Sequence, residues 1–434
     1  MASVTPMMQQ YLDTKAEYKD CILFFRLGDF YEMFFDDART ASRELELTLT
    51  GKDCGLSERA PMCGVPYHAV DTYVEKLIER GYKVAICEQM EDPALAKGLV
   101  KRAVTRIITP GTVIEPAMLD EKANNFLLSI CFVADRAGLA FADVSTGEFY
   151  VHEITQPETT RSDEVARISP MEIICNDQVK LRACLQREMQ NASEQPSAWF
   201  QLANATEALC RHFALNDLSP LGLSDEYKAG ASAAGALMRY LSETQKNALE
   251  HMTSLRIYQG SETMLLDRNT RRNLELTESI RGRSRKGSLL WLLDKTSTAM
   301  GGRLLRSWIE QPLVDEEKIN RRLDAVGEFA QEHVLTMTLA EELQGVYDIE
   351  RLLSKVAYKS MNARDCLSLC ASLQKVPKIR ELLREAKSQA VEEIRDSLDT
   401  LPELTDLLTR AIHPDAPILI TEGGIIRDGY SPTL

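Results

Sequence analysis

The chain contains 434 residues, which at a rough allowance of ~150 residues per domain is enough for about three domains. Its 51 basic and 65 acidic residues give a net charge of −14, which excludes a protein that coats nucleic acid through overall charge, so nucleic-acid binding would need local basic patches. The sequence shows no signal-peptide pattern and no apolar run near the ~18 residues of a membrane span, and its ten cysteines contain no Cys-x-x-Cys pair. These features predict a cytoplasmic protein with reduced thiols and no membrane contact.

The first region, residues 1–112, carries the signals of a mixed α/β domain. Thr5 as an N-cap and Pro6 at the first helical position predict an opening helix. Two short apolar strands and two amphipathic helices are expected to follow. The strands cover residues 22–25 and 84–87, and the helices cover residues 36–47 and 73–81.

Residues 28–35, Gly-Asp-Phe-Tyr-Glu-Met-Phe-Phe, place an aromatic ring and a carboxylate two residues apart just after a Gly-Asp turn. An apolar ring held out on a turn can wedge between stacked bases, and a carboxylate beside it can hydrogen-bond a base edge while repelling phosphates. Phe30 and Glu32 are therefore candidate DNA-binding residues. Taken alone, the octapeptide also fits a core phenylalanine at a strand end and a capping box that begins at Asp29, with Glu32 as its third helical residue.

Two further groups in this region are candidates for DNA contact. Residues 1–110 hold 14 basic and 17 acidic side chains, yet residues 93–114 hold four basic side chains and no acid. Those four are Lys97, Lys101, Arg102 and Arg106. Each phosphate that they neutralise would release counterions and so add non-specific affinity for DNA. A solvated surface face that binds nothing is an equal alternative. Tyr67 and His68, near a helix start, can meet a phosphate or the minor groove, although a lone histidine more often caps or packs.

A turn-rich connection over residues 113–125 leads to a second α/β region, residues 126–252. A hairpin followed by alternating strands and helices predicts a sheet flanked by helices. Asp143 lies where a metal-binding carboxylate would sit on the first strand of a ribonuclease H-like sheet. A two-metal nuclease needs several convergent carboxylates, and Glu148 and Asp177 are not convincingly placed for it. A nuclease is thus the weaker interpretation.

The last region, residues 253–434, replaces strand signals with helical stripes, which predicts an all-α region. One such stripe contains Cys366, Leu369, Cys370 and Leu373 at i, i+3, i+4 and i+7, which indicates a helix facing a core rather than a metal site. The basic run 281–288 lacks the first glycine of a phosphate-binding loop and indicates a solvated loop. We expect no catalytic residues, no metal and no cofactor in this chain.

Several motifs follow one another in the order found in a known family. They are Thr5–Tyr11, Gly28–Glu32, Gly64–Ala69, Ala85–Gln89, Arg106–Thr112, Ala142–Phe149, Arg271–Leu276 and Gly423–Tyr430. On these motifs the whole chain resembles the N-terminal part of the MutS family of bacterial DNA mismatch repair proteins. The resemblance implies a mismatch-recognition domain, a linker, a ribonuclease H-like connector without nuclease activity, and a helical core or lever region that stops before the family's clamp and ATPase. On that basis the domains are residues 1–112, 113–125, 126–252 and 253–434.

The resemblance also implies roles for single residues. Phe30 stacks on a mispaired or unpaired base from the minor groove, and Glu32 hydrogen-bonds that base. The implied partners are mismatched double-stranded DNA, a MutL-type repair factor that meets the connector, and a second copy in the homodimer of the full-length protein. ATP and magnesium are implied for the full-length protein only. A recombination relative and a connector module that acts through protein contacts are the other interpretations, and the Phe-x-Glu turn argues against the first.

Overall fold

The computed structural model describes residues 4–55, 58–91, 98–154, 158–185, 191–246, 249–258, 260–282 and 284–431. The chain divides into two compact units whose segments alternate along the sequence. Unit 1 comprises residues 1–119, 125–161 and 168–257, and unit 2 comprises residues 120–124, 162–167 and 258–434. No helix of the described residues is long and apolar enough to cross a membrane.

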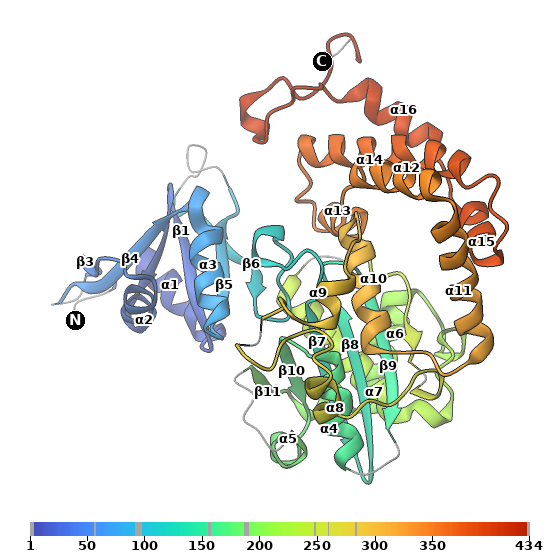
Figure 1. The fold of residues 1–434 in the computed structure, drawn as a ribbon. Coiled ribbons are helices and arrows are strands. Elements are labelled where there is room, and N and C mark those ends of the chain that lie inside the picture. The colour runs from blue at the N-terminus through green and yellow to red at the C-terminus, as the bar shows by residue number, and fades with distance from the viewer. Residues whose placement is uncertain are drawn as a thin grey trace. The chain divides into compact units, whose positions relative to one another are not determined.

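The first sheet of unit 1 has six strands in the order β3-β4-β2-β1-β5-β6 (Figure 1). Its strands are β1 (Cys21–Leu27), β2 (Phe30–Phe34), β3 (Thr50–Lys52), β4 (Ala60–Pro66), β5 (Lys83–Gln89) and β6 (Arg102–Ile108). Its helices are α1 (Pro6–Glu17), α2 (Phe35–Leu45) and α3 (Val70–Glu79), with a 3-10 turn, η1 (Tyr67–Ala69), before α3. The expected strands and helices of this region are all present, and Thr5 caps α1 through its side chain, as predicted.

Apolar residues of β1 alternate between two cores. Ile22 and Phe24 pack in one core with residues of α2 and α3, whereas Leu23 and Phe25 pack in the other with residues of α1. Because helices cover both faces, the strand is a continuous apolar run rather than an alternating one. This is why the run was recognisable in the sequence.

Residues 30–34 form a strand that the sequence patterns did not predict. β2 is hydrogen-bonded to β1 on one side and to β4 on the other, and α2 begins only at Phe35. Glu32 therefore lies in the middle of a strand, and the capping-box alternative is wrong. The ladders on both sides satisfy the backbone of this segment, so it has no need of a helix cap.

The second sheet of unit 1 has six strands in the order β11-β10-β7-β8-β9-β12. Its strands are β7 (Phe126–Val133), β8 (Arg136–Asp143), β9 (Glu148–Ile154), β10 (Glu172–Cys175), β11 (Ala192–Glu194) and β12 (Arg256–Ile257). An antiparallel meander, β7-β8-β9, is extended by β10 parallel to β7 and by β11 parallel to β10. This is the ribonuclease H-like arrangement expected for the connector. β12 extends the sheet with residues from beyond 252, where only helices were expected.

The connector's helices are α4 (Glu158–Ile168), α5 (Gln178–Leu185), α6 (Leu202–Phe213) and α7 (Lys228–Gln245), with 3-10 turns at Ser197–Phe200, Ser219–Leu221 and Asp225–Tyr227. α7 lies against β8 so closely that a Cβ at Gly138 would come within 1.9 Å of the Ala229 carbonyl carbon. Most residues of α7 are buried, and many are alanine or glycine. Small side chains thus let this helix lie directly on the sheet.

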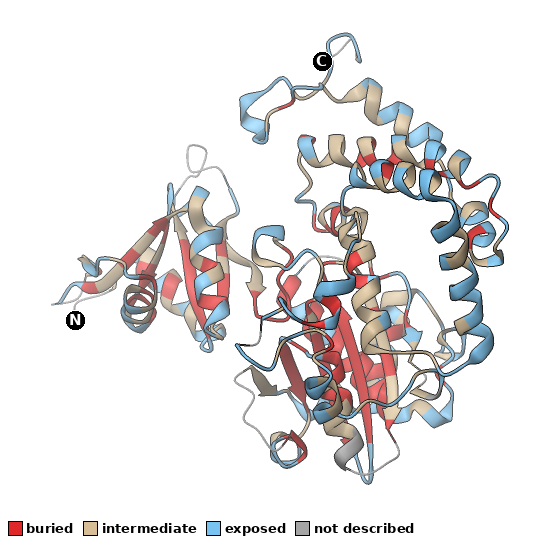
Figure 2. Ribbon diagram, in the orientation of Figure 1, coloured by how far each residue is buried: buried red, intermediate tan, exposed pale blue. Residues whose placement is uncertain are grey.

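Unit 2 is helical in its described residues, as predicted. Besides residues 162–167 of α4, its helices are α8 (Arg268–Asn273), α9 (Leu289–Leu293), α10 (Ala299–Glu310), α11 (Glu316–Gln331), α12 (His333–Gln344), α13 (Ile349–Ala357), α14 (Ala363–Leu382), α15 (Gln389–Ser397) and α16 (Pro402–Ala411), with 3-10 turns at Gly260–Glu262 and Ile420–Glu422. Leu369, Cys370 and Leu373 of α14 are buried, so the predicted stripe does face a core. Figure 2 shows burial concentrated in the sheets of unit 1, whereas α11 and α16 bury no residue.

Candidate nucleic-acid interface

The hairpin between β1 and β2 carries Phe30 at its tip. Leu27 pairs with Phe30, so the turn consists of Gly28 and Asp29 alone, and Gly28 has a φ of +59°. Two-residue hairpin turns need such positive φ angles, which glycine adopts without strain. Three other phenylalanines of β1 and β2 are fully buried: Phe24, Phe25 and Phe34. Phe30 is 46% exposed, so the core-phenylalanine alternative is wrong.

Glu32 lies on the same face of β2 as Phe30, since side chains two residues apart in a strand point the same way. Its cross-strand neighbour in β4 is Gly64, where a Cβ would lie 3.2 Å from the Tyr31 carbonyl oxygen and 3.5 Å from the Glu32 Cγ. Glu32 Oε2 accepts a hydrogen bond of 2.6 Å from the Nζ of Lys52, and the Glu32 side chain is 16% exposed. The carboxylate is thus half-enclosed and already paired with a cation.

Tyr67 and His68 lie beside the hairpin tip. The Tyr67 backbone N–H donates to the Asp29 carbonyl at 2.9 Å, which ties the 3-10 turn to the hairpin. Tyr67 is 42% exposed, and the Arg26 guanidinium lies 3.9 Å from the centre of its ring. The ring of His68 meets that of Tyr67 edge-on at 5.7 Å. The structure therefore brings four of the predicted site residues together: Phe30, Glu32, Tyr67 and His68.

Arg26 belongs to this cluster but was not predicted from the sequence. Its Nε donates to the Gly28 carbonyl, and its guanidinium stacks on Tyr67 and lies 5.4 Å from the Tyr31 ring. The only feature of the sequence that could have pointed to Arg26 is its place as a single arginine near the end of an apolar strand, just before the Gly-Asp turn. Arg26 and Tyr67 both hydrogen-bond the turn, Arg26 at the Gly28 carbonyl and Tyr67 at the Asp29 carbonyl.

Arg102 supports the hairpin from within the domain. Its Nε donates to the Arg26 carbonyl at 2.7 Å, and its Nη1 donates to Gln10 Oε1 at 3.0 Å. Burial lowers the pKa of Arg102 below its usual value. Lys101 is exposed, and its backbone N–H donates to Glu91 at 2.7 Å. Lys97 lies outside the described residues.

Arg106 lies apart from the hairpin, on the side of the domain that meets the connector. Its Nη1 pairs with Glu115, its Nε donates to Gln245 of α7 at 3.1 Å, and its Nη2 donates to the Thr112 carbonyl at 3.1 Å. The acid-free stretch of residues 93–114 is therefore not one basic face. These internal partners favour a structural role for Arg106, and its contact with DNA stays a prediction.

A buried polar cluster joins the first sheet to the connector within unit 1. Glu172 is 1% exposed and accepts from the Tyr240 hydroxyl at 2.6 Å, from the Gly111 N–H at 3.2 Å and from the Thr109 hydroxyl. Lys83 Nζ lies 3.7 Å from Glu172 Oε1. Burial, followed by the charge of Glu172, raises the pKa of Tyr240 well above its usual value. The cluster holds the hairpin-bearing domain against the sheet of the connector.

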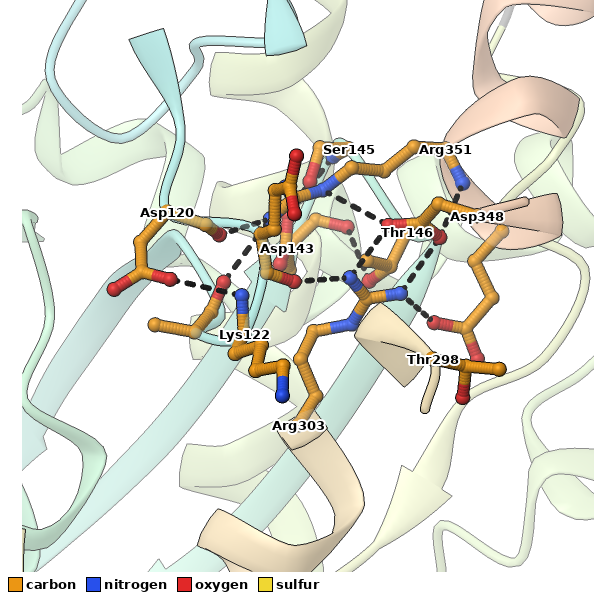
Figure 3. Close-up of polar contacts among 12 residues, drawn as sticks. Asp120, Lys122, Asp143, Ser145, Thr146, Thr298, Arg303, Asp348 and Arg351 are labelled. Atoms are coloured by element: carbon orange, nitrogen blue, oxygen red, sulfur yellow. Dashed lines mark hydrogen bonds and ion pairs between the residues drawn. The ribbon is translucent and has the colours of Figure 1, made fainter. Parts of the chain in front are cut away.

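Asp143 has structural partners in unit 1. It ends β8, the second strand of the sheet, so the expected place on the first strand is wrong. Its carboxylate accepts from the Asn125 N–H at 3.0 Å and from the N–H and hydroxyl of Ser145 at 2.9 and 2.7 Å (Figure 3). Glu148 accepts from Tyr150, and Asp177 from the Lys180 N–H. No group of three or more metal-ligating side chains occurs in the described part of the chain.

Lys122 anchors the short linker segment of unit 2, residues 120–124. Its Nζ lies 3.1 Å from both carboxylate oxygens of Asp294 and 3.0 Å from the Thr296 hydroxyl. Burial acts to raise the pKa of Asp294, but hydrogen bonds from Thr296 and the contact with Lys122 outweigh it and lower that pKa to about 2. A Cβ at Gly302 of α10 would come within 2.7 Å of Lys122 Cγ and Cδ. The segment is thus docked on α10.

Two buried arginines complete this anchor (Figure 3). Arg303 pairs with Asp348 at 2.7 Å and with Glu350 at 2.6 Å, and its Nη1 also donates to the Glu121 carbonyl at 2.9 Å. Arg351 Nη2 donates to the carbonyls of residues 120 and 123 at 2.9 and 3.0 Å. The helices of unit 2 therefore hold the backbone as well as the lysine of the segment.

Comparison with known proteins finds three family models that match successive parts of the chain. Residues 5–117 match MutS domain I, residues 125–253 match MutS domain II, and residues 269–430 match MutS domain III.

Curated relatives match the chain along its length. The DNA mismatch repair protein MutS of Ruminiclostridium cellulolyticum is 50% identical over 439 residues, which cover 100% of this chain and 50% of the relative. The DNA mismatch repair protein MutS of Acetivibrio thermocellus is 51% identical over 438 residues, which cover 99% of this chain and 50% of the relative. The chain spans about half the length of the curated relatives it matches.

Proposed function

The chain belongs to the MutS family of DNA mismatch repair proteins, and from this we propose that it recognises mispaired or unpaired bases in double-stranded DNA with its Phe30 hairpin. The observation that carries the proposal is the 46% exposure of Phe30, directly after a two-residue turn and beside buried phenylalanines. Arg26 and Tyr67 brace that turn, so the ring is held out before DNA arrives.

Phe30 inserts from the minor groove and unstacks one base step. Unstacking costs roughly a few kcal/mol per step and costs least where pairing is already faulty, so a mismatch is the easiest place to kink the duplex. Base edges in the minor groove are degenerate, which suits a protein that must accept many different mispairs. Such a protein gains selectivity by reading deformability.

Glu32 hydrogen-bonds the base that Phe30 displaces. On an intact duplex its negative charge lies near phosphates with no base donor to offset the repulsion, so it weakens binding to matched DNA. The two side chains therefore have separate tasks. Phe30 makes binding depend on how easily the duplex deforms, and Glu32 stabilises a displaced base by a hydrogen bond.

The other predicted contacts hold the DNA backbone or support those that do. Tyr67 and His68 lie next to Phe30 and meet the sugar-phosphate backbone, and Lys97 and Lys101 contact phosphates. Arg102 supports the hairpin through the Arg26 carbonyl. With a net charge of −14 on the chain, we expect these contacts to give only modest affinity at physiological salt.

Further properties are proposed only for a full-length protein of this family. They are binding of ATP and magnesium, homodimerisation, contact of the connector with a MutL-type repair factor, and a cytoplasmic location. The chain itself matches family domains I to III, and no enzymatic activity is proposed for it.

Phe30→Ala tests the proposal. We expect the variant to lose the preference for a mismatched over a matched duplex, measured by fluorescence anisotropy at fixed salt, because the wedge is gone. Val179→Ala is the matched control, since Val179 is a 79%-exposed apolar residue of the connector helix α5. Retention of the preference in Phe30→Ala would overturn the wedge role.

A further inference from the structure

The Glu32 carboxylate is held by one oxygen only. Lys52 Nζ lies 2.6 Å from Oε2, and no other side chain bonds Glu32 in the described part of the first domain. The Glu32 and Lys52 side chains are 16% and 32% exposed, so the pair is neither sealed from solvent nor freely solvated. Oε1 therefore keeps the capacity to accept a hydrogen bond from outside the protein.

Lys52 reaches Glu32 from the edge of the sheet. It ends β3, pairs with Ala60 of β4, and passes within 5.7 Å of the centre of the Phe34 ring. Gly64, the cross-strand neighbour of Glu32, has no side chain, and a Cβ at that position would lie 3.5 Å from the Glu32 Cγ. The lysine side chain crosses β4, which lies between β3 and β2, to reach the carboxylate.

We propose that Lys52 is a positioning residue for base recognition. It holds one oxygen of the Glu32 carboxylate and leaves the other oxygen to accept a hydrogen bond from an incoming base. It also offsets part of the negative charge of Glu32, which would otherwise repel the DNA phosphates. The proposal rests on the proposed function of the Phe30 hairpin. On a matched duplex no base donor reaches Glu32, and the pair stays as it is. At a mispair the carboxylate accepts from the lysine and the base together, because its two oxygens can serve two donors.

The pair has the strength that this task requires. Solvent-exposed ion pairs contribute about as much as a two- to fivefold change in an equilibrium constant, and a contribution of that order from this partly enclosed pair favours one rotamer of the glutamate. A long lysine that only gripped a phosphate would instead act on every duplex alike and would add to the salt dependence of binding. The two roles therefore differ in what they do to selectivity.

A double-mutant cycle tests the proposal on the whole chain. Wild type, Lys52→Met, Glu32→Gln and the double variant are titrated with a mismatched and a matched duplex by fluorescence anisotropy at several salt concentrations. We expect Lys52→Met to lower the mismatched-to-matched affinity ratio about two- to fivefold in the wild-type background and less than twofold in the Glu32→Gln background. Lys52→Arg, which keeps the charge, should restore most of the ratio.

Lys19→Met is the matched control, because Lys19 is an exposed lysine just before β1, at the end of that strand far from the hairpin. It should leave the ratio unchanged. An unchanged ratio in Lys52→Met, or an equal loss for both duplexes in both backgrounds with a shallower salt dependence, would overturn the proposal. Absence of any mismatch preference in the wild type would instead overturn the proposed function, and it is seen before any Lys52 variant is measured.

Discussion

Glu32 places a negative charge beside the surface where we propose that the DNA duplex, itself negatively charged, binds. Its side chain is enclosed enough to be held and exposed enough to be reached, and Lys52 offsets part of its charge. The repulsion that remains acts on every duplex, whereas a base donor is available only where the duplex has opened. The selectivity contributed by Glu32 is thus the difference between a small repulsion of the phosphates and a small stabilisation from the hydrogen bond to a displaced base.

Glu32→Ala should tighten binding to matched DNA more than to mismatched DNA. On matched DNA the variant loses only repulsion, whereas on mismatched DNA it also loses the hydrogen bond to the base. We expect a gain of about two- to fivefold for the matched duplex, as for an exposed ion pair. Titration of both duplexes at fixed salt measures it, and an unchanged matched affinity would show that the carboxylate exerts no repulsion.

His251 makes the stability of unit 1 depend on pH. Its Nε2–H donates to the Val144 carbonyl at 2.8 Å, and burial lowers the pKa of His251 below its usual value. Between that lowered pKa and the ~6.5 of the unfolded chain, the unfolded state binds more protons, so stability falls as the pH drops below ~6.5.

His251→Gln should therefore flatten the fall in stability between pH 7 and 5. Urea unfolding followed by the fluorescence of Trp199, in a chain with Trp291 and Trp308 replaced by phenylalanine, measures this for unit 1. The difference between wild type and variant isolates the histidine from the carboxylates. Equal pH slopes for the two proteins would contradict the prediction.

Among the elements, the β1–β2 hairpin depends on a backbone angle as much as on contacts. Gly28 has nothing within 4 Å of an added Cβ, but its φ of +59° strains most other residues, alanine among them. Judged by the open space alone, this position would wrongly be expected to accept a larger residue. The strain would fall on the turn that presents Phe30.

Gly28→Ala should destabilise the hairpin by about 1 kcal/mol and weaken mismatch binding. Hydrogen exchange of β1 and β2 measures the local effect. Gly327→Ala provides a control of opposite sign, because Gly327 lies in α11 with open space around it and alanine favours a helix by about 1 kcal/mol. Unchanged exchange of β1 and β2 in Gly28→Ala would contradict the prediction.

The elements that local patterns specify were predictable, and those that depend on neighbours were not. The Thr5–Pro6 helix start and the apolar runs of β1 and β5 were recognised from the sequence. β2 and β4 were missed, because their pairing rather than their composition makes them strands. β12 was missed for the same reason, since two residues added to the edge of a sheet carry no periodic signal.

The candidate site divides in the same way. Phe30, Glu32, Tyr67 and His68 were found because each lies in a contiguous motif at a turn or a helix start. Arg26 and Lys52 were missed because cross-strand contacts give them their roles. The internal partners of Arg106 include Gln245, 139 residues along the chain, which no local pattern reveals.

On the scale of the whole molecule, the two units are interleaved rather than consecutive. The chain passes between them five times, after residues 119, 124, 161, 167 and 257. Residues 120–124 join two segments of unit 1 but are held by Asp294, Arg303 and Arg351 of unit 2. The integrity of unit 2 therefore depends on a linker that the sequence marked only as turn-rich.

Lys122→Met should destabilise unit 2 by about 1–2 kcal/mol at neutral pH, because it leaves the buried Asp294 carboxylate with fewer partners. The pKa of Asp294 is lowered to about 2, so its contribution is present above the ~3.9 of an unfolded aspartate and is lost as the pH falls from there towards 2. The difference between wild type and variant should shrink over that range. Urea unfolding followed by Trp291 and Trp308 fluorescence measures it, and a pH-independent difference would contradict the prediction.

The anchor of the linker has a consequence for synthesis on the ribosome. Asp294 follows Lys122 by 172 residues, and Arg351 follows the carbonyl it binds at Asp120 by 231. At ~5–20 residues per second, Lys122 emerges roughly 10–30 s before its partner exists. The hairpin-bearing domain and much of the connector can fold in that interval. Residues 120–124 can form their contacts only later, after the helices of unit 2 that carry Arg303 and Arg351 have been synthesised.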